Sequence, residues 1–224
     1  MLTISEFGTG QAGTTPPQYC FIVRMDVQHD KEALFNEIYD AEHIPEIGRV
    51  PGVRRITRYR TRVPHEPSYM AVYEIERPDV PLSPEWKAAS DTGRWAPEVR
   101  PYTMNREHNR AICTRIGRHE GLTYTTRHLF LEMMDVEPRK EALFDEIYES
   151  ERLPALIKAP GVKSIVRFGA NEKGHPAYLA LCEIERPDVP ASKEFARADR
   201  ERRWRSEILP YTYNRHLVVY KRIM

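Results

Sequence analysis

The chain has 224 residues, and its 34 Lys and Arg nearly balance its 33 Asp and Glu. That balance gives no electrostatic basis for binding nucleic acid or an anionic membrane. With 41% hydrophobic and 30% charged residues, the composition is typical of a globular protein, and no apolar run reaches the length of a membrane span.

Neither the opening residues nor the cysteines suggest secretion. Residues 1–18 are rich in Gly and Thr and lack the basic start and apolar core of a signal peptide, so we expect a flexible leader. None of Cys20, Cys113 and Cys182 has a cysteine at the corresponding place of the internal repeat described next. We therefore expect three reduced thiols in a cytoplasmic protein.

A tandem repeat organises the rest of the chain. Residues 31–39 read KEALFNEIY and residues 140–148 read KEALFDEIY, at an offset of 109 residues. The same offset holds without a gap, because residues 74–81 and 183–190 both read EIERPDVP. A unit of about 100 residues is the size of one small domain. The repeat predicts an N-terminal lobe over 19–117 and a C-terminal lobe over 118–224.

In the first lobe, residues 19–25 (YCFIVRM) are apolar on both faces, which predicts a strand covered on two sides. The next stretch predicts a helix that Pro45 ends or kinks. Residues 53–62 and 69–76 then predict a hairpin turning around residues 64–67, which would bring Arg58 near Glu74 as a cross-strand ion pair.

A second helix begins where Ser83 can cap it and Pro84 occupies its first turn, and residues 102–116 contain a closing strand. The second lobe repeats these elements, with Ser192 as the cap, and brings Arg167 near Glu183. Each lobe therefore reads β-α-β-β-α-β, which folds as a ferredoxin-like sheet with both helices on one face. We predict an α+β fold of two such lobes, packed sheet to sheet as an intramolecular pseudo-dimeric barrel.

The stretch YDAEHIP at 39–45, followed by VPGV at 50–53 and by RY at 58–59, resembles a known pattern. It is similar to the helix-turn-strand region of ethyl tert-butyl ether degradation (EthD) proteins in the dimeric α+β barrel superfamily. The second copy departs from it at Arg152, where the pattern has histidine. That superfamily includes muconolactone-type isomerases, cofactor-free monooxygenases, polyketide cyclases and haem-binding chlorite dismutases. The resemblance implies a small, often aromatic ligand bound between the sheet and helices of a lobe.

His43 is the main candidate for chemistry. It lies one helical turn after Tyr39 on the same face, so both side chains are expected to point into one pocket. His43 would act as acid or base with Tyr39 assisting, and Arg58 would place a substrate carboxylate or oxyanion if Glu74 leaves it free. The alternative is that His43 is simply a polar residue near the negative pole of the helix dipole.

The remaining candidates are expected to bind substrate. Tyr69, Trp86 and Trp95 would line an apolar pocket for a flat ligand, although the same side chains equally describe an ordinary core. Tyr148, Arg152 and Arg167 are their second-lobe counterparts, where the arginine in place of His43 would favour an anion.

Several chemistries lack support. No histidine pair has metal-ligand spacing, and the chain has no glycine-rich phosphate loop, GxSxG elbow or CxxC motif. Haem stays open, because one histidine suffices as axial ligand. We predict a cofactor-independent enzyme that transfers protons on a small hydrophobic or aromatic-derived compound, as an isomerase, lyase or dehydratase. The alternatives are a cofactor-free monooxygenase, a haem-binding barrel or a non-catalytic ligand-binding protein. The protein is expected as a monomer with an internal pseudo-twofold axis or as a homodimer.

Overall fold

The computed structural model describes residues 16–117, 120–200 and 203–224. Residues 1–15 of the expected leader lie outside these residues. The chain forms two compact units: unit 1 contains Met1–Arg60, Pro67–Thr114 and Ile223–Met224, and unit 2 contains Thr61–Glu66 and Arg115–Arg222. Both units are α+β, and every strand pairing described below is antiparallel.

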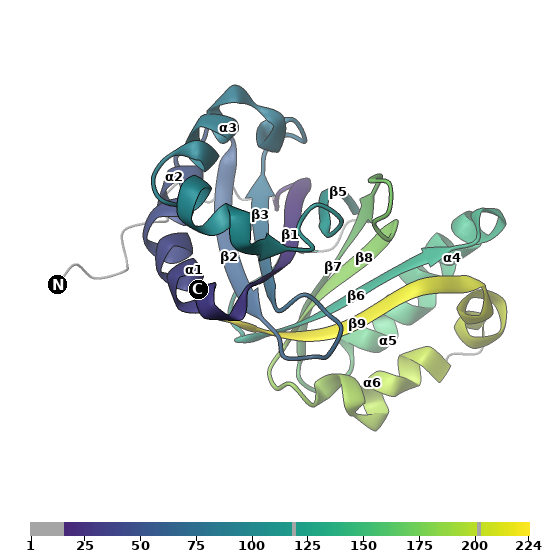
Figure 1. Ribbon diagram of the computed structural model, residues 1–224. Helices are drawn as coiled ribbons and strands as arrows, with labels where there is room; N and C mark the ends of the chain where they lie inside the picture. Colours follow the sequence, from purple (N-terminus) through teal and green to yellow (C-terminus); the bar gives the residue numbers. More distant parts are fainter. Residues whose placement is uncertain (1–15, 118–119, 201–202) are drawn as a thin grey trace. The chain divides into compact units, whose positions relative to one another are not determined.

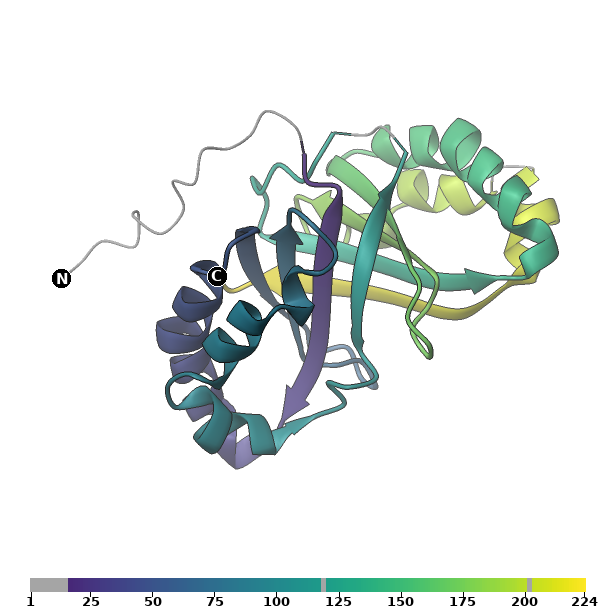
Figure 2. The same cartoon turned by 90° about the horizontal axis from the view of Figure 1, so that it is seen from above.

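Unit 1 is a sheet with helices on one face (Figures 1 and 2). The sheet order is β2-β3-β1, and β5 and β4 pair successively with the other edge of β1. The strands are β1 (Tyr19–Val27), β2 (Val53–Arg60), β3 (Tyr69–Ile75), β4 (Thr103–Met104) and β5 (Arg110–Ile116). The helices are α1 (Glu32–Ile38), α2 (Ile44–Gly48) and α3 (Pro84–Asp91), with π turns at Tyr39–His43 and Trp95–Val99.

Unit 2 repeats this plan with the sheet order β7-β8-β6-β9. Its strands are β6 (His128–Val136), β7 (Val162–Ala170), β8 (Tyr178–Ile184) and β9 (Thr212–Arg222). Its helices are α4 (Glu141–Ile147), α5 (Leu153–Ile157) and α6 (Lys193–Arg197), with π turns at Tyr148–Arg152 and Trp204–Ile208. The predicted single closing strand is confirmed here as β9, whereas unit 1 divides it into β4 and β5.

Each unit has its own core between the helices and the sheet. In unit 1 this core holds Phe35, Ile38, Tyr39, Tyr73 and Trp95, all at most 2% exposed. Their counterparts in unit 2 include Phe144, Ile147, Tyr148 and Trp204. Burying aromatic side chains of this size is the main gain in free energy available to such small units.

The local sequence sets the helix boundaries. The predicted caps are confirmed: Ser83 Oγ accepts from Trp86 N–H at 3.1 Å, and Ser192 Oγ accepts from Phe195 N–H at 3.2 Å. Pro45 does not end the first helix, because a π turn carries the chain into α2. There the Ile44 N–H bonds to the Tyr39 carbonyl, and Pro45, which has no N–H, occupies the first turn of α2.

The hairpin register differs from the prediction. Arg58 lies opposite Ala71, and it is Arg55 that lies opposite Glu74, with Nε and Oε2 3.7 Å apart. In unit 2 Arg167 likewise lies opposite Ala180 rather than near Glu183. The slip is three residues, an odd number, so it moves each arginine to the opposite sheet face. Arg58 and Arg167 consequently face the helices.

Candidate functional site

The π turn at Tyr39–His43 places these two residues side by side in the core. The two rings meet edge to face with centroids 4.9 Å apart, and the His43 ring stacks on Trp95 at 4.4 Å. The Tyr39 hydroxyl shares a hydrogen bond of 2.5 Å with the Tyr73 hydroxyl. The structure therefore brings the two predicted catalytic residues together in a closed aromatic cluster, where His43 is 7% exposed.

His43 is neutral at physiological pH. Burial, aided by the positive charges of Arg100, Arg106 and Arg58, lowers its pKa from 6.5 to about 3. Its Nδ1 atom is buried and has no hydrogen-bond partner among the described residues. Such an orphaned polar atom costs free energy unless a ligand or water satisfies it. A neutral imidazole can exchange hydrogen bonds, but it is a weak base.

Burial also keeps the neighbouring phenols protonated. It raises the pKa of Tyr39, and Arg58 partly opposes this rise. Burial raises the pKa of Tyr73 well above its usual value, with the Tyr39 hydroxyl adding to the effect. Both residues therefore act as hydroxyl donors or acceptors at neutral pH.

Arg58 is almost fully buried under α1. Its Nη1 donates to Asp40 Oδ1, and its Nη2 donates to Asn36 Oδ1 at 2.9 Å. Its guanidinium carbon lies 4.2 Å from the centroid of the Tyr39 ring. Because protein groups already occupy both terminal nitrogens, Arg58 positions Tyr39 rather than offering an open site for a carboxylate.

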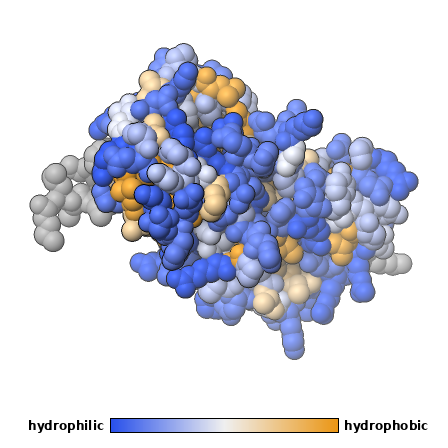
Figure 3. Space-filling view, in the orientation of Figure 1, coloured by the Kyte–Doolittle hydropathy of each residue, from blue (hydrophilic) through white to orange (hydrophobic). Residues whose placement is uncertain are grey.

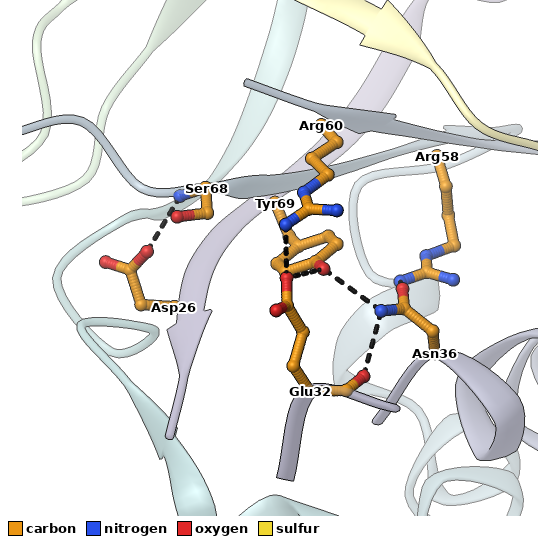
Figure 4. Close-up of polar contacts among 7 residues, drawn as sticks. All are labelled: Asp26, Glu32, Asn36, Arg58, Arg60, Ser68 and Tyr69. Carbon is orange, nitrogen blue, oxygen red and sulfur yellow. Dashed lines mark hydrogen bonds and ion pairs between the residues drawn. The ribbon is translucent and has the colours of Figure 1, made fainter. Parts of the chain in front are cut away.

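Tyr69 belongs to a polar network at the edge of the same layer (Figure 4). Its hydroxyl donates to Glu32 Oε1 at 2.6 Å and accepts from Asn36 Nδ2 at 3.0 Å. Arg60 Nη2 donates to the same Glu32 oxygen at 2.5 Å. The predicted binding residue Tyr69 is thus held by a carboxylate, an amide and a guanidinium.

The two predicted tryptophans of unit 1 have different neighbours. Trp95 is in the core against His43, and its Nε1 atom is buried without a hydrogen-bond partner among the described residues. Trp86, on α3, is half-buried and packs edge to face on Tyr73, with centroids 5.2 Å apart. The cluster therefore extends from His43 through Tyr39 and Tyr73 to Trp86.

Unit 2 replaces this neutral cluster with buried charges. Glu132, on β6, accepts from the Tyr148 hydroxyl at 2.9 Å and from Arg152 Nη2 at 2.7 Å. Arg152 also donates to Asp199 and stacks on Trp204, with its guanidinium carbon 4.1 Å from the ring. Three positions change together, since the unit 1 counterparts of Glu132, Arg152 and Asp199 are Val23, His43 and Ser90.

Arg167 repeats the arrangement of Arg58 with more acidic partners. Its terminal nitrogens donate to Glu149 at 2.5 Å and to Asp145 at 2.8 Å, and its guanidinium lies 4.0 Å from the Tyr148 ring. The three predicted second-lobe residues, Tyr148, Arg152 and Arg167, therefore lie in one network. Arg152 is no open anion site, because carboxylates already hold both of its terminal nitrogens.

A small hollow lies in unit 2 between α4 and the sheet. It is open to solvent and has room for about one water molecule. It is lined by Glu132, Met134, Phe144, Tyr148, Arg167, Tyr178, Leu179 and Ala180. Glu132 was not among the predicted site residues, although a charged residue within the apolar strand HLFLEMM was a signal that pointed to it.

The described residues include no group of three His, Cys, Asp or Glu side chains able to hold a metal ion. The hollow of unit 2 has no histidine in its lining, and the His43 imidazole is stacked on Trp95, so neither offers an axial nitrogen beside a space for haem.

Within the described part of the chain, no helix has the length and apolar character to cross a membrane.

The described residues on the face shown in Figure 3 form no extended apolar patch. The face in Figure 3 is mainly hydrophilic, and hydrophobic residues are scattered over it. Scattered apolar residues such as Leu82, which is 77% exposed, are ordinary on a protein surface.

Comparison with solved structures identifies the fold. A "putative monooxygenase" from Fusobacterium nucleatum matches with a TM-score of 0.60 and 12% identity, covering 95% of this chain and 94% of the other. A mutant chlorite dismutase from Candidatus Nitrospira defluvii matches with a TM-score of 0.65 and 10% identity, over 92% and 93% of the two chains. These structures belong to the dimeric α+β barrel superfamily, and the present chain has a fold similar to theirs. No family model and no curated protein sequence matches the chain.

Proposed function

We propose that the protein is an enzyme that transfers protons on a small hydrophobic or aromatic-derived compound without a cofactor, as an isomerase, lyase or dehydratase. His43 and Tyr39 are the proposed catalytic residues. The observation that carries the proposal is the neutral, buried His43, whose unpartnered Nδ1 lies in the same cluster as the hydroxyl pair of Tyr39 and Tyr73. A buried nitrogen without a hydrogen-bond partner destabilises the fold, and a hydrogen bond to a substrate would remove that cost.

The pKa of His43 restricts the chemistry. An imidazole with a pKa of about 3 is a weak base, so the proposed substrate needs a strongly acidified C–H, such as one flanked by two carbonyl groups. In the proposed step the imidazole takes that proton and returns it to a neighbouring atom of the substrate, while the Tyr39 hydroxyl hydrogen-bonds the carbonyl oxygen. Arg58 positions Tyr39, and Tyr69, Trp86 and Trp95 form the apolar walls. Since His43 is 7% exposed, Trp95 or its neighbours must move to admit the substrate.

The test begins with a thermal-shift screen of aromatic acids and lactones, because a molecule that binds only the native state raises the melting temperature. Compounds that bind are then assayed for isomerisation or loss of water. His43→Ala is expected to abolish turnover while the circular dichroism spectrum is unchanged. His29→Ala, at an exposed site, is the matched control. Normal turnover in His43→Ala would refute the assignment.

A non-catalytic ligand-binding protein is the second candidate. The closed packing around His43 favours it, because a solvent-reached cavity at Tyr39 and His43 would be expected of an enzyme. On this reading Tyr148, Arg152 and Arg167 form the ligand-binding side of unit 2. Ligands that stabilise the protein without being transformed would support it. Ligand-dependent oxygen consumption would instead indicate the cofactor-free monooxygenase, the class in the name of one structural neighbour.

The repeat also supports proposals about architecture. We propose that the lobes 19–117 and 118–224 are ferredoxin-like halves that arose by tandem duplication, related to the EthD group and packed sheet to sheet as an intramolecular barrel. The equal strand orders of the two units and the offset of 109 residues support this history. A cytoplasmic location, and a monomeric or homodimeric state, stay predictions that cell fractionation and light scattering test.

A further inference from the structure

Two of the three cysteines form a pair in unit 1. Cys20, on β1, lies directly opposite Cys113, on β5, in the antiparallel pairing of these strands. Both residues belong to unit 1, and β5 runs beside β1 (Figure 2). The residues of β1 that pack against the helices have odd numbers, such as Val23 and Met25. Cys20 and Cys113 therefore lie on the other face of the sheet, where each is at most 1% exposed.

The two thiols are also in contact. Burial raises the pKa of the Cys20 thiol well above its usual value, and a hydrogen bond with Cys113 contributes to this rise. The Cys113 thiol donates to the carbonyl oxygen of Ala111 at 3.5 Å. Because its hydrogen is used in that bond, the Cys113 sulfur is the acceptor for the Cys20 thiol. Both cysteines are free, so two reduced sulfurs lie side by side.

The strand register places the two cysteines at a separation that a disulfide can span. The Arg24 N–H donates to the Asn109 carbonyl at 2.7 Å, which makes these two residues a hydrogen-bonded pair. Cys20 and Cys113 lie four residues further along each strand, so they form the same kind of pair. The Cα atoms of such a pair are about 5.5 Å apart, inside the range of roughly 4.4–6.8 Å found for disulfides. The Cβ atoms must approach a little for the bond to close, so we expect a bond that is easily reduced.

The repeat shows that the fold does not require this pair. Leu129, the counterpart of Cys20 on β6, lies opposite Tyr220 in unit 2. Cys182 belongs to the core of unit 2, and no cysteine lies opposite it in either of its strand pairings. Cys182 therefore serves as an internal control for the pair in unit 1.

We infer that Cys20 and Cys113 form a reversible disulfide when the protein is exposed to hydrogen peroxide. One sulfur, as its thiolate, attacks a peroxide oxygen, which gives a sulfenic acid and releases hydroxide. The second thiol attacks the sulfenic sulfur, so that the S–S bond forms and the hydroxyl group leaves as water. In total, two thiols and one hydrogen peroxide give one disulfide and two water molecules. The inference is independent of the function proposed for His43.

The burial of both thiols determines how the pair responds. Buried thiols react slowly, so oxidation depends on transient opening of β5. The pair should therefore respond to sustained oxidation rather than to a brief pulse. Once formed, the bond ties β5 to β1 and closes a loop that contains all three α-helices of unit 1. Such a cross-link restricts the unfolded chain and opposes the opening of β5.

The test is oxidation of the reduced full chain with excess hydrogen peroxide under native conditions, followed by denaturation, alkylation of free thiols and mass spectrometry. Alkylated cysteines are expected to fall from three to one, with a disulfide joining the tryptic peptides of Cys20 and Cys113. A disulfide that contains Cys182, a covalent dimer, or sulfinic acid at the pair would overturn the inference, as would three unreacted thiols. The chain oxidised in concentrated urea is the control, and it should form disulfides of Cys182 as well.

Two variants separate the pair from the third cysteine. Cys182→Ala is expected to form the disulfide in full and to retain no free thiol. Cys113→Ala should keep both of its thiols under the same treatment, because Cys20 then has no partner. Circular dichroism checks that both variants fold, and the peptide mapping of the unaltered chain does not depend on them. Loss of thiols from Cys113→Ala at the rate of the unaltered chain would contradict the inference.

Hydrogen exchange measures the consequence for the fold. Amides of β5 are expected to exchange about tenfold more slowly in the oxidised protein than in the reduced one, because the cross-link restricts their opening. The strands of unit 2 should exchange at unchanged rates. Dithiothreitol, added without denaturant, should restore three free thiols and the original exchange rates. Unchanged exchange of β5, or a disulfide that is reduced only after denaturation, would contradict a reversible cross-link.

Discussion

The imidazole of His43 stacks on the indole of Trp95, with centroids 4.4 Å apart and an angle of 23° between the planes. In unit 2 the guanidinium of Arg152 takes the corresponding position, 4.1 Å from the Trp204 ring. One stacking platform thus holds a neutral ring in one unit and a permanent cation in the other.

The stability of the protein should fall with acid in a way that depends on His43. Its folded pKa of about 3 lies below the unfolded value of 6.5, so below pH 6.5 the unfolded chain binds a proton that the folded chain refuses. Stability is therefore lost as pH falls from 6.5 toward 3, by up to about 1.4 kcal/mol per pH unit. Relative to His43→Phe, the wild type should lose about 2 kcal/mol between pH 7 and pH 5. Urea unfolding at each pH measures this, with His29→Gln as the control.

The buried ion pair of Glu132 and Arg152 should show energetic coupling, so that the two single substitutions together cost more free energy of unfolding than the double substitution. Arg152→Met leaves Glu132, 3% exposed, without its closest cation and should cost about 3–5 kcal/mol. Glu132→Val combined with Arg152→Met should cost less than the sum of the two single variants by about 2 kcal/mol. Urea unfolding of all four proteins forms the cycle, and additive costs would show that the pair is not coupled.

The two hydroxyls of Tyr39 and Tyr73 should depend on each other. Tyr39→Phe leaves the Tyr73 hydroxyl buried without a partner, and the converse holds for Tyr73→Phe, so each variant should lose about 1–2 kcal/mol. The double variant should be no less stable than either single one, because no orphaned hydroxyl remains. Thermal and urea unfolding measure the effect, and Tyr178→Phe, whose hydroxyl has no hydrogen bond among the described residues, serves as the matched control.

Two glycines with similar backbone angles should respond differently to alanine. Gly161 has a φ of +90° and Gly174 a φ of +84°. An alanine at either position adopts this left-handed conformation at a cost of about 1 kcal/mol in folding free energy. At Gly161 the new Cβ would also lie 2.7 Å from Val189 Cγ2, whereas at Gly174 nothing lies within 4 Å. Gly161→Ala should therefore cost at least about 2 kcal/mol and Gly174→Ala about half of that. Equal losses would show that only the backbone angle matters.

The order of helices and strands could be predicted from the sequence, because this order depends on local patterns of residues. Apolar alternation indicated the strands, and the serines before each second helix formed the caps that Ser83 and Ser192 make in the structure. The pairing of Tyr39 with His43 on one helix face also followed from spacing, and the π turn preserved it.

The partners of Arg58 were beyond sequence reasoning, because they depend on register. The loop between β2 and β3 joins Arg60 to Tyr69 as opposing residues, and no local signal distinguishes this from the slip of three residues that would pair Arg58 with Glu74. The burial of His43 was likewise invisible, since the sequence gives its face on the helix but not the tryptophan that covers it. Glu132 could be recognised in the sequence as a charge within an apolar strand. Its two partners, Tyr148 and Arg152, become apparent only in the structure.

The described residues contain four π turns, and each begins with an aromatic residue: Tyr39, Trp95, Tyr148 and Trp204. Each turn accommodates one more residue than a regular helix would. At Tyr39–His43 and Tyr148–Arg152, where the π turn joins two α-helical segments, deleting one residue would restore ordinary helical winding and remove the extra position that separates the aromatic residue from His43 or Arg152. Loops of this protein should accept changes in length, whereas a one-residue deletion in either of these two turns would change which side chain stacks on Trp95 or Trp204.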